Sequence, residues 1–116
     1  MKNGDNKKLS QTLMFLGGMP NTKGFHYLKE GIRYCISDPR SVMNMKKLLY
    51  PKVADTFETT PAAVERALRT AINGSWHRRD RELAHQIFRN AVQSDADTPT
   101  SSLYIAAVAE WLNDEE

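Results

Sequence analysis

Proline residues divide this chain into short segments, and their positions favour helices. Asp38-Pro39 and Thr60-Pro61 each place a capping side chain directly before a proline. Such a pair is typical of a helix start, because the cap accepts a hydrogen bond from the first turn and proline tolerates the first helical position. Pro51 disfavours helical geometry in the residue before it, so it ends one helix and can open the next. No segment shows the sustained apolar–polar alternation of a strand. The chain is therefore predicted to be all-α.

Apolar residues at helical spacing predict a compact bundle of about six helices. The expected helical segments are residues 9–16, 23–37, 39–49, 51–57, 61–76, 80–92 and 100–112. Residues 1–8 are polar and are expected to form a flexible N-terminal segment, followed by a single domain over 9–116. The segments 39–49 and 51–57 are expected to bury Val42, Met45, Leu48, Leu49, Val53, Ala54 and Phe57.

The composition is that of one globular domain. A chain of 116 residues can bury a single hydrophobic core, and its 41% hydrophobic and 26% charged residues are ordinary values. No apolar run approaches the roughly 20 residues that cross a bilayer, and the polar start lacks the apolar core of a signal peptide. The single cysteine, Cys35, is expected to be a buried, reduced thiol. We therefore expect a cytoplasmic protein with no membrane partner.

Charge is distributed unevenly along the chain. Residues 1–60 carry ten Lys and Arg against five Asp and Glu, and residues 61–92 carry six Arg against three acids. Residues 93–116 carry six acids and no Lys or Arg. A polyanion would therefore meet the first two parts of the chain and be repelled by the third.

The segment 48–76 predicts a helix-turn-helix unit, with the two helices over about 51–76. A short helix is followed by a tight turn at 58–60 and by a longer helix that begins with Pro61. Such a unit places the start of its second helix in the major groove of DNA. Rotation by 100° per residue puts Val64, Ala67, Leu68, Ala71 and Ile72 on the core side of that helix.

The opposite side of the same helix carries groups that suit base reading. Arginine can bond guanine, asparagine can bond adenine, and threonine offers a hydroxyl and a methyl group. Small side chains at the start would let the helix approach the groove floor, and the glutamate could orient an arginine or accept from cytosine. The predicted base-reading residues are Ala62, Ala63, Glu65, Arg66, Arg69, Thr70 and Asn73.

Cationic and polar groups on both sides of this helix are predicted to contact phosphates, which supply affinity and register without sequence choice. This second set comprises Thr60, Lys46, Lys47, Lys52, His77, Arg78, Arg79 and Arg81. A charged helix face is often only a solvated face. The short preceding helix, the tight turn and the following arginines favour DNA binding over that interpretation.

Catalysis has little support in the sequence. His26, His77 and His85 fall on different segments, without the spacing of a metal site or an acid–base pair. Gly17-Gly18 follows no strand and precedes no Walker lysine, so it is not a phosphate loop. We expect no enzyme activity, no metal and no cofactor. The alternative to DNA binding is a helical protein-interaction module, in which Tyr104 and Trp111 would anchor a partner instead of packing in the core.

Five stretches of the chain resemble the C-terminal effector domain of the stage-zero sporulation protein A family. They are KGFHYLKEGI (23–32), LLYPKVADTFETT (48–60), VERALRTAI (64–72), Trp76 and PTSSLYIAAVA (99–109), and the whole resemblance covers roughly residues 12–112. The resemblance implies a six-helical domain with a helix-turn-helix that works as the effector of a response regulator in a two-component system. It also implies binding to promoter elements, commonly as pairs on tandem sites, and contact with RNA polymerase sigma factors.

Carried over by position, Glu65, Arg66 and Arg69 match the acidic and basic positions of that family's recognition helix. Two positions depart from the family pattern, since Ala63 stands where arginine is typical and Thr70 where histidine is typical. Both departures predict an altered or relaxed DNA element. The 116 residues contain no receiver domain, which fits either an excised effector domain or a homologue without phosphorylation control.

Overall fold

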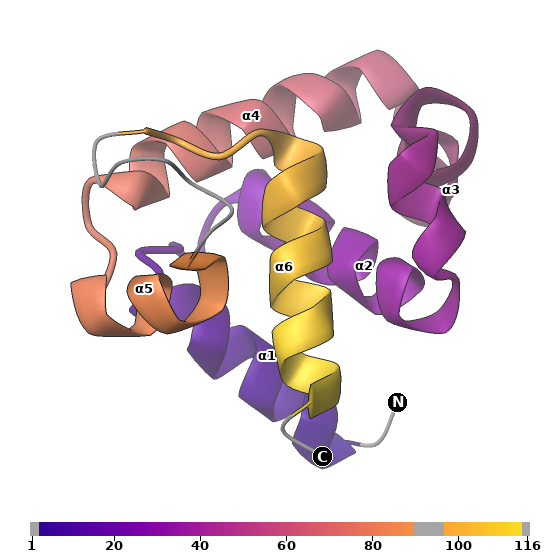
Figure 1. Cartoon of the computed structure of the whole chain (residues 1–116). Helices are drawn as coiled ribbons and strands as arrows, with labels where there is room; N and C mark the ends of the chain where they lie inside the picture. Colours follow the sequence, from indigo (N-terminus) through magenta and orange to yellow (C-terminus); the bar gives the residue numbers. More distant parts are fainter. Residues whose placement is uncertain (1–2, 90–96, 115–116) are drawn as a thin grey trace.

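The computed structural model describes residues 3–89 and 97–114, with side chains from residue 6 onward. Every regular element in these ranges is helical, which confirms the predicted all-α class (Figure 1). The elements are α1 (Asn3–Phe15), α2 (Lys23–Ser37), η1 (Pro39–Met43), η2 (Met45–Leu49), α3 (Tyr50–Thr56), α4 (Pro61–Trp76), α5 (Arg81–Phe88) and α6 (Ser101–Asp114). Within the same ranges, none of the helices is long and apolar enough to cross a bilayer.

Side-chain caps explain where most of these helices begin. The Oγ1 of Thr22 accepts from the backbone N–H of Phe25 before α2, and the Oγ1 of Thr60 accepts from Ala63 at 3.1 Å before α4. The Asp80 carboxylate accepts from Leu83 at 2.9 Å before α5. Each cap satisfies a donor that the first turn of a helix leaves without an intrahelical partner.

Three helix boundaries differ from the sequence prediction. α1 begins at Asn3, so it includes most of the stretch that was expected to be a flexible segment. The predicted helix 39–49 is a 3-10 turn followed by a π-helical turn, because Asn44 leaves the helical region at φ −147° and caps the second turn. α5 ends at Phe88 because Arg89 adopts a positive φ of 20°, and the remainder of the predicted segment 80–92 lies outside the described residues.

Two side chains that were predicted to be buried are exposed. Leu48 is 37% exposed, because the π-helical turn rotates it away from the core while Leu49 is fully buried. Phe57 is 38% exposed at the end of α3, where its ring lies against the ring of Tyr27 at a centroid distance of 5.0 Å. The other five residues predicted on these segments are buried or half-buried.

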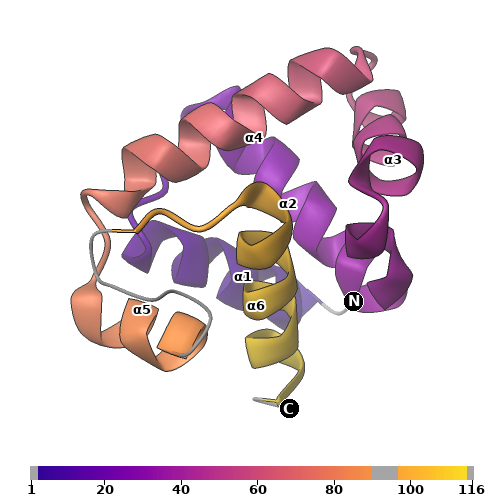
Figure 2. The ribbon, with the colours of Figure 1, turned by 45° about the horizontal axis from the view of Figure 1, so that its top comes forward.

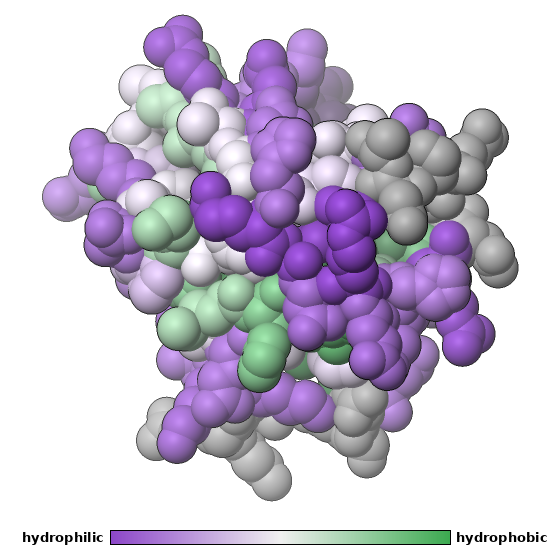
Figure 3. All heavy atoms as spheres, turned by 90° about the vertical axis from the view of Figure 1, so that its left-hand side faces the viewer, coloured by the Kyte–Doolittle hydropathy of each residue, from purple (hydrophilic) through white to green (hydrophobic). Residues whose placement is uncertain are grey.

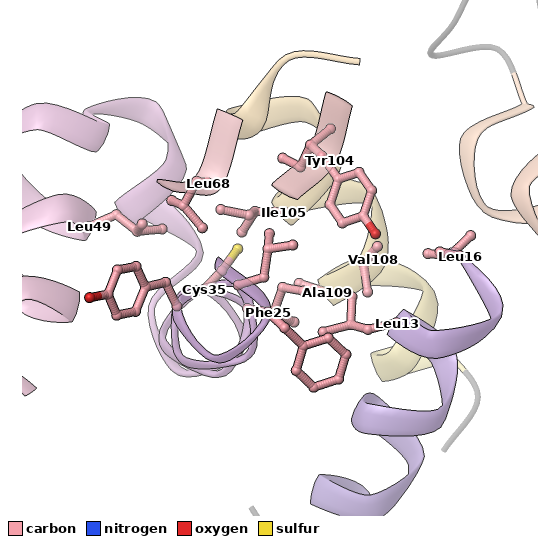
Figure 4. Packing of buried hydrophobic residues seen from close by; sticks show 14 of the residues in the cluster. Leu13, Leu16, Phe25, Cys35, Leu49, Leu68, Tyr104, Ile105, Val108 and Ala109 are labelled. Atoms are coloured by element: carbon pink, nitrogen blue, oxygen red, sulfur yellow. The ribbon is translucent and has the colours of Figure 1, made fainter. Parts of the chain in front are cut away.

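The core forms where α2 and α6 meet, with α1 and α4 closing it from either side (Figure 4). From α6, Tyr104, Ile105 and Val108 point toward the side chains of α2 and of the end of α1. α2 and α4 approach closely at Gly24, where a Cβ atom would lie 2.7 Å from the Cβ of Ala71. The lack of a side chain at this position therefore determines how near α4 lies to α2.

The turn between α1 and α2 is joined to the end of α4. Gly17 has a φ of +91°, and a Cβ there would lie 2.2 Å from the carbonyl oxygen of Ser75. The Arg78 Nε donates to the Gly17 carbonyl at 3.1 Å, and the Asp80 N–H donates to the Phe15 carbonyl at 2.8 Å. These contacts join the end of α4 to the α1–α2 turn. The start of α4, by contrast, follows α3.

Candidate nucleic-acid interface

Helix α4 lies along one edge of the molecule, with α2 beneath it and α3 beside its first turns (Figure 2). Its inward side buries Val64, Leu68 and Ile72 completely or almost completely, as the sequence predicted. Ala67 and Ala71 are half-buried where α4 crosses α2. The helix is thus supported along one side and open along the other.

The outward side of α4 presents most of the predicted base-reading residues to solvent. Those that are exposed are Ala62, Arg66, Arg69, Thr70 and Asn73, whereas Ala63 and Glu65 are half-buried beside them. In the part of the chain that the structure describes, no element covers this row. It is available to a partner along about three turns of helix.

Arg66 and Arg69 differ in their surroundings. Arg69 lies 3.9 Å from the Glu65 carboxylate, one turn earlier, and its side chain is 64% exposed. A solvated pair of this kind contributes little to stability, but it limits the directions that the arginine side chain takes. Among the described residues Arg66 has no such ion pair, so its guanidinium group is free to meet a ligand.

The turn before α4 sets the direction in which the helix leaves α3. Glu58 adopts a φ of 54°, and the Thr59 N–H donates to the Ala54 carbonyl at 2.9 Å. Together with the Thr60 cap, these features form the short connection between α3 and α4. Pro61 and Ala62 in the first turn of α4 are exposed, at the positive end of the helix dipole.

The lysines predicted to contact phosphate lie on the elements before α4. Lys46, Lys47 and Lys52 are all exposed, the first two on η2 and the third on α3. The Lys52 ammonium group lies 6.0 Å from the Tyr34 ring. α3 packs against α4, and η2 packs against α3.

The cationic group that follows α4 has a structural role that the sequence did not reveal. Arg78 bonds the Gly17 carbonyl, and the Arg79 guanidinium lies 4.2 Å from the centre of the Trp76 ring and donates to the Trp76 carbonyl. His77 and Arg81 are exposed. Arg78 and Arg79 thus stabilise the end of α4, and their contact with phosphate stays a prediction.

Two hollows flank α4 and divide six of the seven predicted base-reading residues between them, since Ala62 lines neither. One, of about 500 Å³, lies toward α2 and includes Ala63, Arg66 and Thr70. The other, of about 400 Å³, lies toward the start of α6 and includes Glu65, Arg69 and Asn73. The sequence predicted one continuous face and did not indicate that it has two distinct edges.

The second hollow contains polar groups that sequence reasoning missed. Tyr50, Ser101 and Ser102 line it together with Arg69 and Asn73. Partial burial raises the pKa of the Tyr50 hydroxyl, and the nearby Glu65 carboxylate adds to the effect. The hydroxyl stays protonated at neutral pH and can donate a hydrogen bond. No local sequence signal links Tyr50 to residues 101 and 102, because only the tertiary fold brings them together.

The residues that the structure describes contain no group of three or more His, Cys, Asp or Glu side chains that could hold a metal ion. Cys35 is buried, and this burial raises the pKa of its thiol. Its sulfur is therefore protonated at neutral pH and is a poor nucleophile.

Comparison with known families accounts for this arrangement. A family model described as "Sporulation initiation factor Spo0A C terminal" matches residues 9–112, which is most of the chain. The match includes α4, the elements before it from residue 9 onward and the whole of the described core. The family is a regulatory domain of transcription factors that binds DNA and has no catalytic role. The chain therefore belongs to the Spo0A C-terminal family, and it is a DNA-binding effector domain and not an enzyme.

Proposed function

We propose that this domain recognises a specific double-stranded DNA element, with α3 and α4 acting as a helix-turn-helix and the first half of α4 lying in the major groove. The observation that carries the proposal is the outward row on α4, in which Arg66, Arg69 and Asn73 are exposed while Leu68 and Ile72 are buried behind them. The major groove admits a helix, and these side chains are those that best distinguish guanine and adenine.

In this arrangement the residues have separate tasks. Arg66 and Arg69 would donate to guanine. Asn73, in the second half of α4, would hydrogen-bond an adenine at the end of the contacted element. Glu65 would hold Arg69 toward the groove through the ion pair described above. Ala62 and Ala63 would allow the close approach, and Thr70 would contact a thymine methyl group or a base edge.

Affinity would come from phosphate contacts on both sides of the groove. Thr60, Lys46, Lys47 and Lys52 would contact one strand near the start of α4, while His77 and Arg81 lie toward its other end. Arg78 and Arg79 would contribute only with those donor groups that their intramolecular contacts leave available. These contacts position the helix and carry no sequence information.

Membership of the family supports three further proposals about the cellular role. The domain would regulate transcription in the cytoplasm, it would bind as pairs on tandem elements, and it would contact a sigma factor of RNA polymerase. Ala63 and Thr70 depart from the family's typical arginine and histidine, so the preferred element would differ from the usual one at one or two base pairs.

A protein-interaction module without DNA binding is less well supported. The two aromatic side chains that would have anchored a partner instead pack in or against the core of the domain. Tyr104 is 1% exposed, and Trp111 is half-buried against the core with the Lys8 ammonium group 5.7 Å from its ring.

Selection from a random pool of duplex oligonucleotides tests the proposal directly. The purified chain should enrich one short element, and the enriched duplex should bind at least tenfold more tightly than a scrambled duplex of the same length. Equal binding of the enriched and scrambled duplexes would mean that α4 does not read sequence.

A further inference from the structure

The hollow between α4, α2 and the α1–α2 turn has the size of a small-molecule site. Its volume of about 500 Å³ lies within the range of about 300–1,000 Å³ found for ligand pockets. Figure 3 views the side of the molecule on which the α1–α2 turn lies, and it shows a group of apolar residues surrounded by polar ones.

Small residues create this hollow. Gly18 and Gly74 contribute no side chain to it, and Ala67 and Ala71 contribute only methyl groups. A Cβ at Gly74 would meet a single neighbouring atom, the Arg78 Nη2 at 3.8 Å. The space above Gly74 is therefore open, and a ligand could occupy it without displacing the core.

The inner lining is apolar. Leu13, Phe25, Leu28 and Tyr104 form its floor and are each no more than 3% exposed, so the accessible apolar surface comes from Met19, which is 45% exposed, and from the half-buried Ala67 and Ala71. Leaving such a surface in water is unfavourable, so an apolar chain would gain free energy by covering it.

The charged groups of the hollow have one sign. Arg66 and Arg78 both line it, whereas none of the described residues that line it is acidic. Arg78 is fixed there by its bond to Gly17, which uses Nε and leaves the two Nη groups for a ligand. A guanidinium with two donors side by side matches the two oxygens of a carboxylate.

We propose that this hollow binds an amphipathic anion of the medium-chain carboxylate class, with the carbon chain against Met19, Ala67 and Ala71 and the head group at Arg66 and Arg78. Ala63, Arg66 and Thr70 belong both to this hollow and to the predicted base-reading face. An anion bound there therefore competes with DNA, a consequence that rests on the proposed function.

Calorimetric titration of the DNA-free chain with decanoate, below its critical micelle concentration, tests the site itself. We expect saturable one-to-one binding of decanoate and none of decyltrimethylammonium, which has a similar chain and the opposite charge. Met19→Glu should weaken decanoate binding about tenfold, because it adds a negative charge at the edge of the hollow. Met14→Glu is the matched control, since Met14 is 51% exposed and lies outside the lining.

Gly74→Leu provides a second variant, because its side chain would fill the open space and should abolish decanoate binding while a thermal melt shows a folded domain. Equal binding of the anion and the cation, or equal loss in the Met14 and Met19 variants, would overturn the proposal. The enriched duplex gives a separate measurement. Decanoate binding without any loss of DNA affinity would overturn the competition alone, and a chain that binds decanoate but no specific DNA would overturn the proposed function alone.

Discussion

At the scale of single residues, α4 shows how two identical side chains three positions apart acquire different surroundings. Arg66 faces the hollow toward α2, and Arg69 faces the hollow toward α6 with Glu65 beside it. Both are exposed, and both were predicted to read bases. Their separation to the two edges of the helix means that they would meet base pairs at different positions of the element.

Replacing either arginine by alanine tests base reading. We expect Arg66→Ala and Arg69→Ala each to cost about 1–3 kcal/mol on the enriched duplex and to relax the choice at one base pair. Fluorescence anisotropy with duplexes substituted one position at a time measures this. The exposed Lys47→Ala serves as the control, because it should weaken specific and scrambled duplexes alike. The same uniform loss in the arginine variants would reduce them to phosphate contacts.

Gly17 and Gly74 predict opposite effects of one substitution. Gly17→Ala should destabilise the domain by about 2 kcal/mol or more, because its φ of +91° is unfavourable for alanine and the new Cβ would overlap the Ser75 carbonyl. Gly74→Ala should stabilise it by up to about 1 kcal/mol, since the position is helical and the Cβ has room. Urea denaturation of both variants measures the two free energies of unfolding. A Gly17 variant as stable as the parent would contradict the contact between the α1–α2 turn and α4.

At the scale of elements, the start of α4 is determined by Thr60 and Pro61. The threonine hydroxyl accepts from Ala63, and proline needs no donor at the first helical position. The regular periodicity of α4 then places Leu68 inward and Arg69 outward. A helix that began one residue later would still have the same faces, but its first turn would lose the cap.

Loss of the cap is therefore expected to lower the free energy of unfolding more than it changes DNA recognition. Thr60→Ala should cost about 1 kcal/mol of unfolding free energy, whereas Thr60→Ser should keep most of it because serine also caps. Thermal unfolding followed by circular dichroism compares the two. If the alanine and serine variants melt together, the hydroxyl contributes nothing to the start of α4.

At the scale of the whole molecule, charge is separated along the chain and the fold keeps the basic elements beside α4. Lys52 lies on α3, which packs against α4, and Lys46 and Lys47 lie on η2, which packs against α3. His77 directly follows α4, and Arg81 is the first residue of α5. A surface of this kind attracts a polyanion from a distance comparable to the Debye length, about 8–10 Å at physiological salt.

The affinity for DNA should therefore fall steeply with salt. A plot of log affinity against log salt concentration should be linear, with a slope of about −0.9 for each phosphate neutralised. Lys52→Ala should make the slope shallower by about one, because it removes one phosphate contact. Binding measured at four or more salt concentrations gives both slopes. An affinity independent of salt would favour recognition without phosphate contacts and would count against the proposed mode.

The sequence by itself determined those features that arise within a few residues of one another. The caps at Thr60 and Asp80, the proline at the start of α4 and the inward side of that helix follow from hydrogen bonds and side-chain spacing within one or two turns. Only the tertiary structure decided that Arg78 bonds Gly17, that Leu48 and Phe57 face outward, and that Tyr50 shares a hollow with Ser101 and Ser102. The physical reason is distance along the chain, because burial and partner choice depend on segments up to 61 residues apart, whose approach no local pattern records.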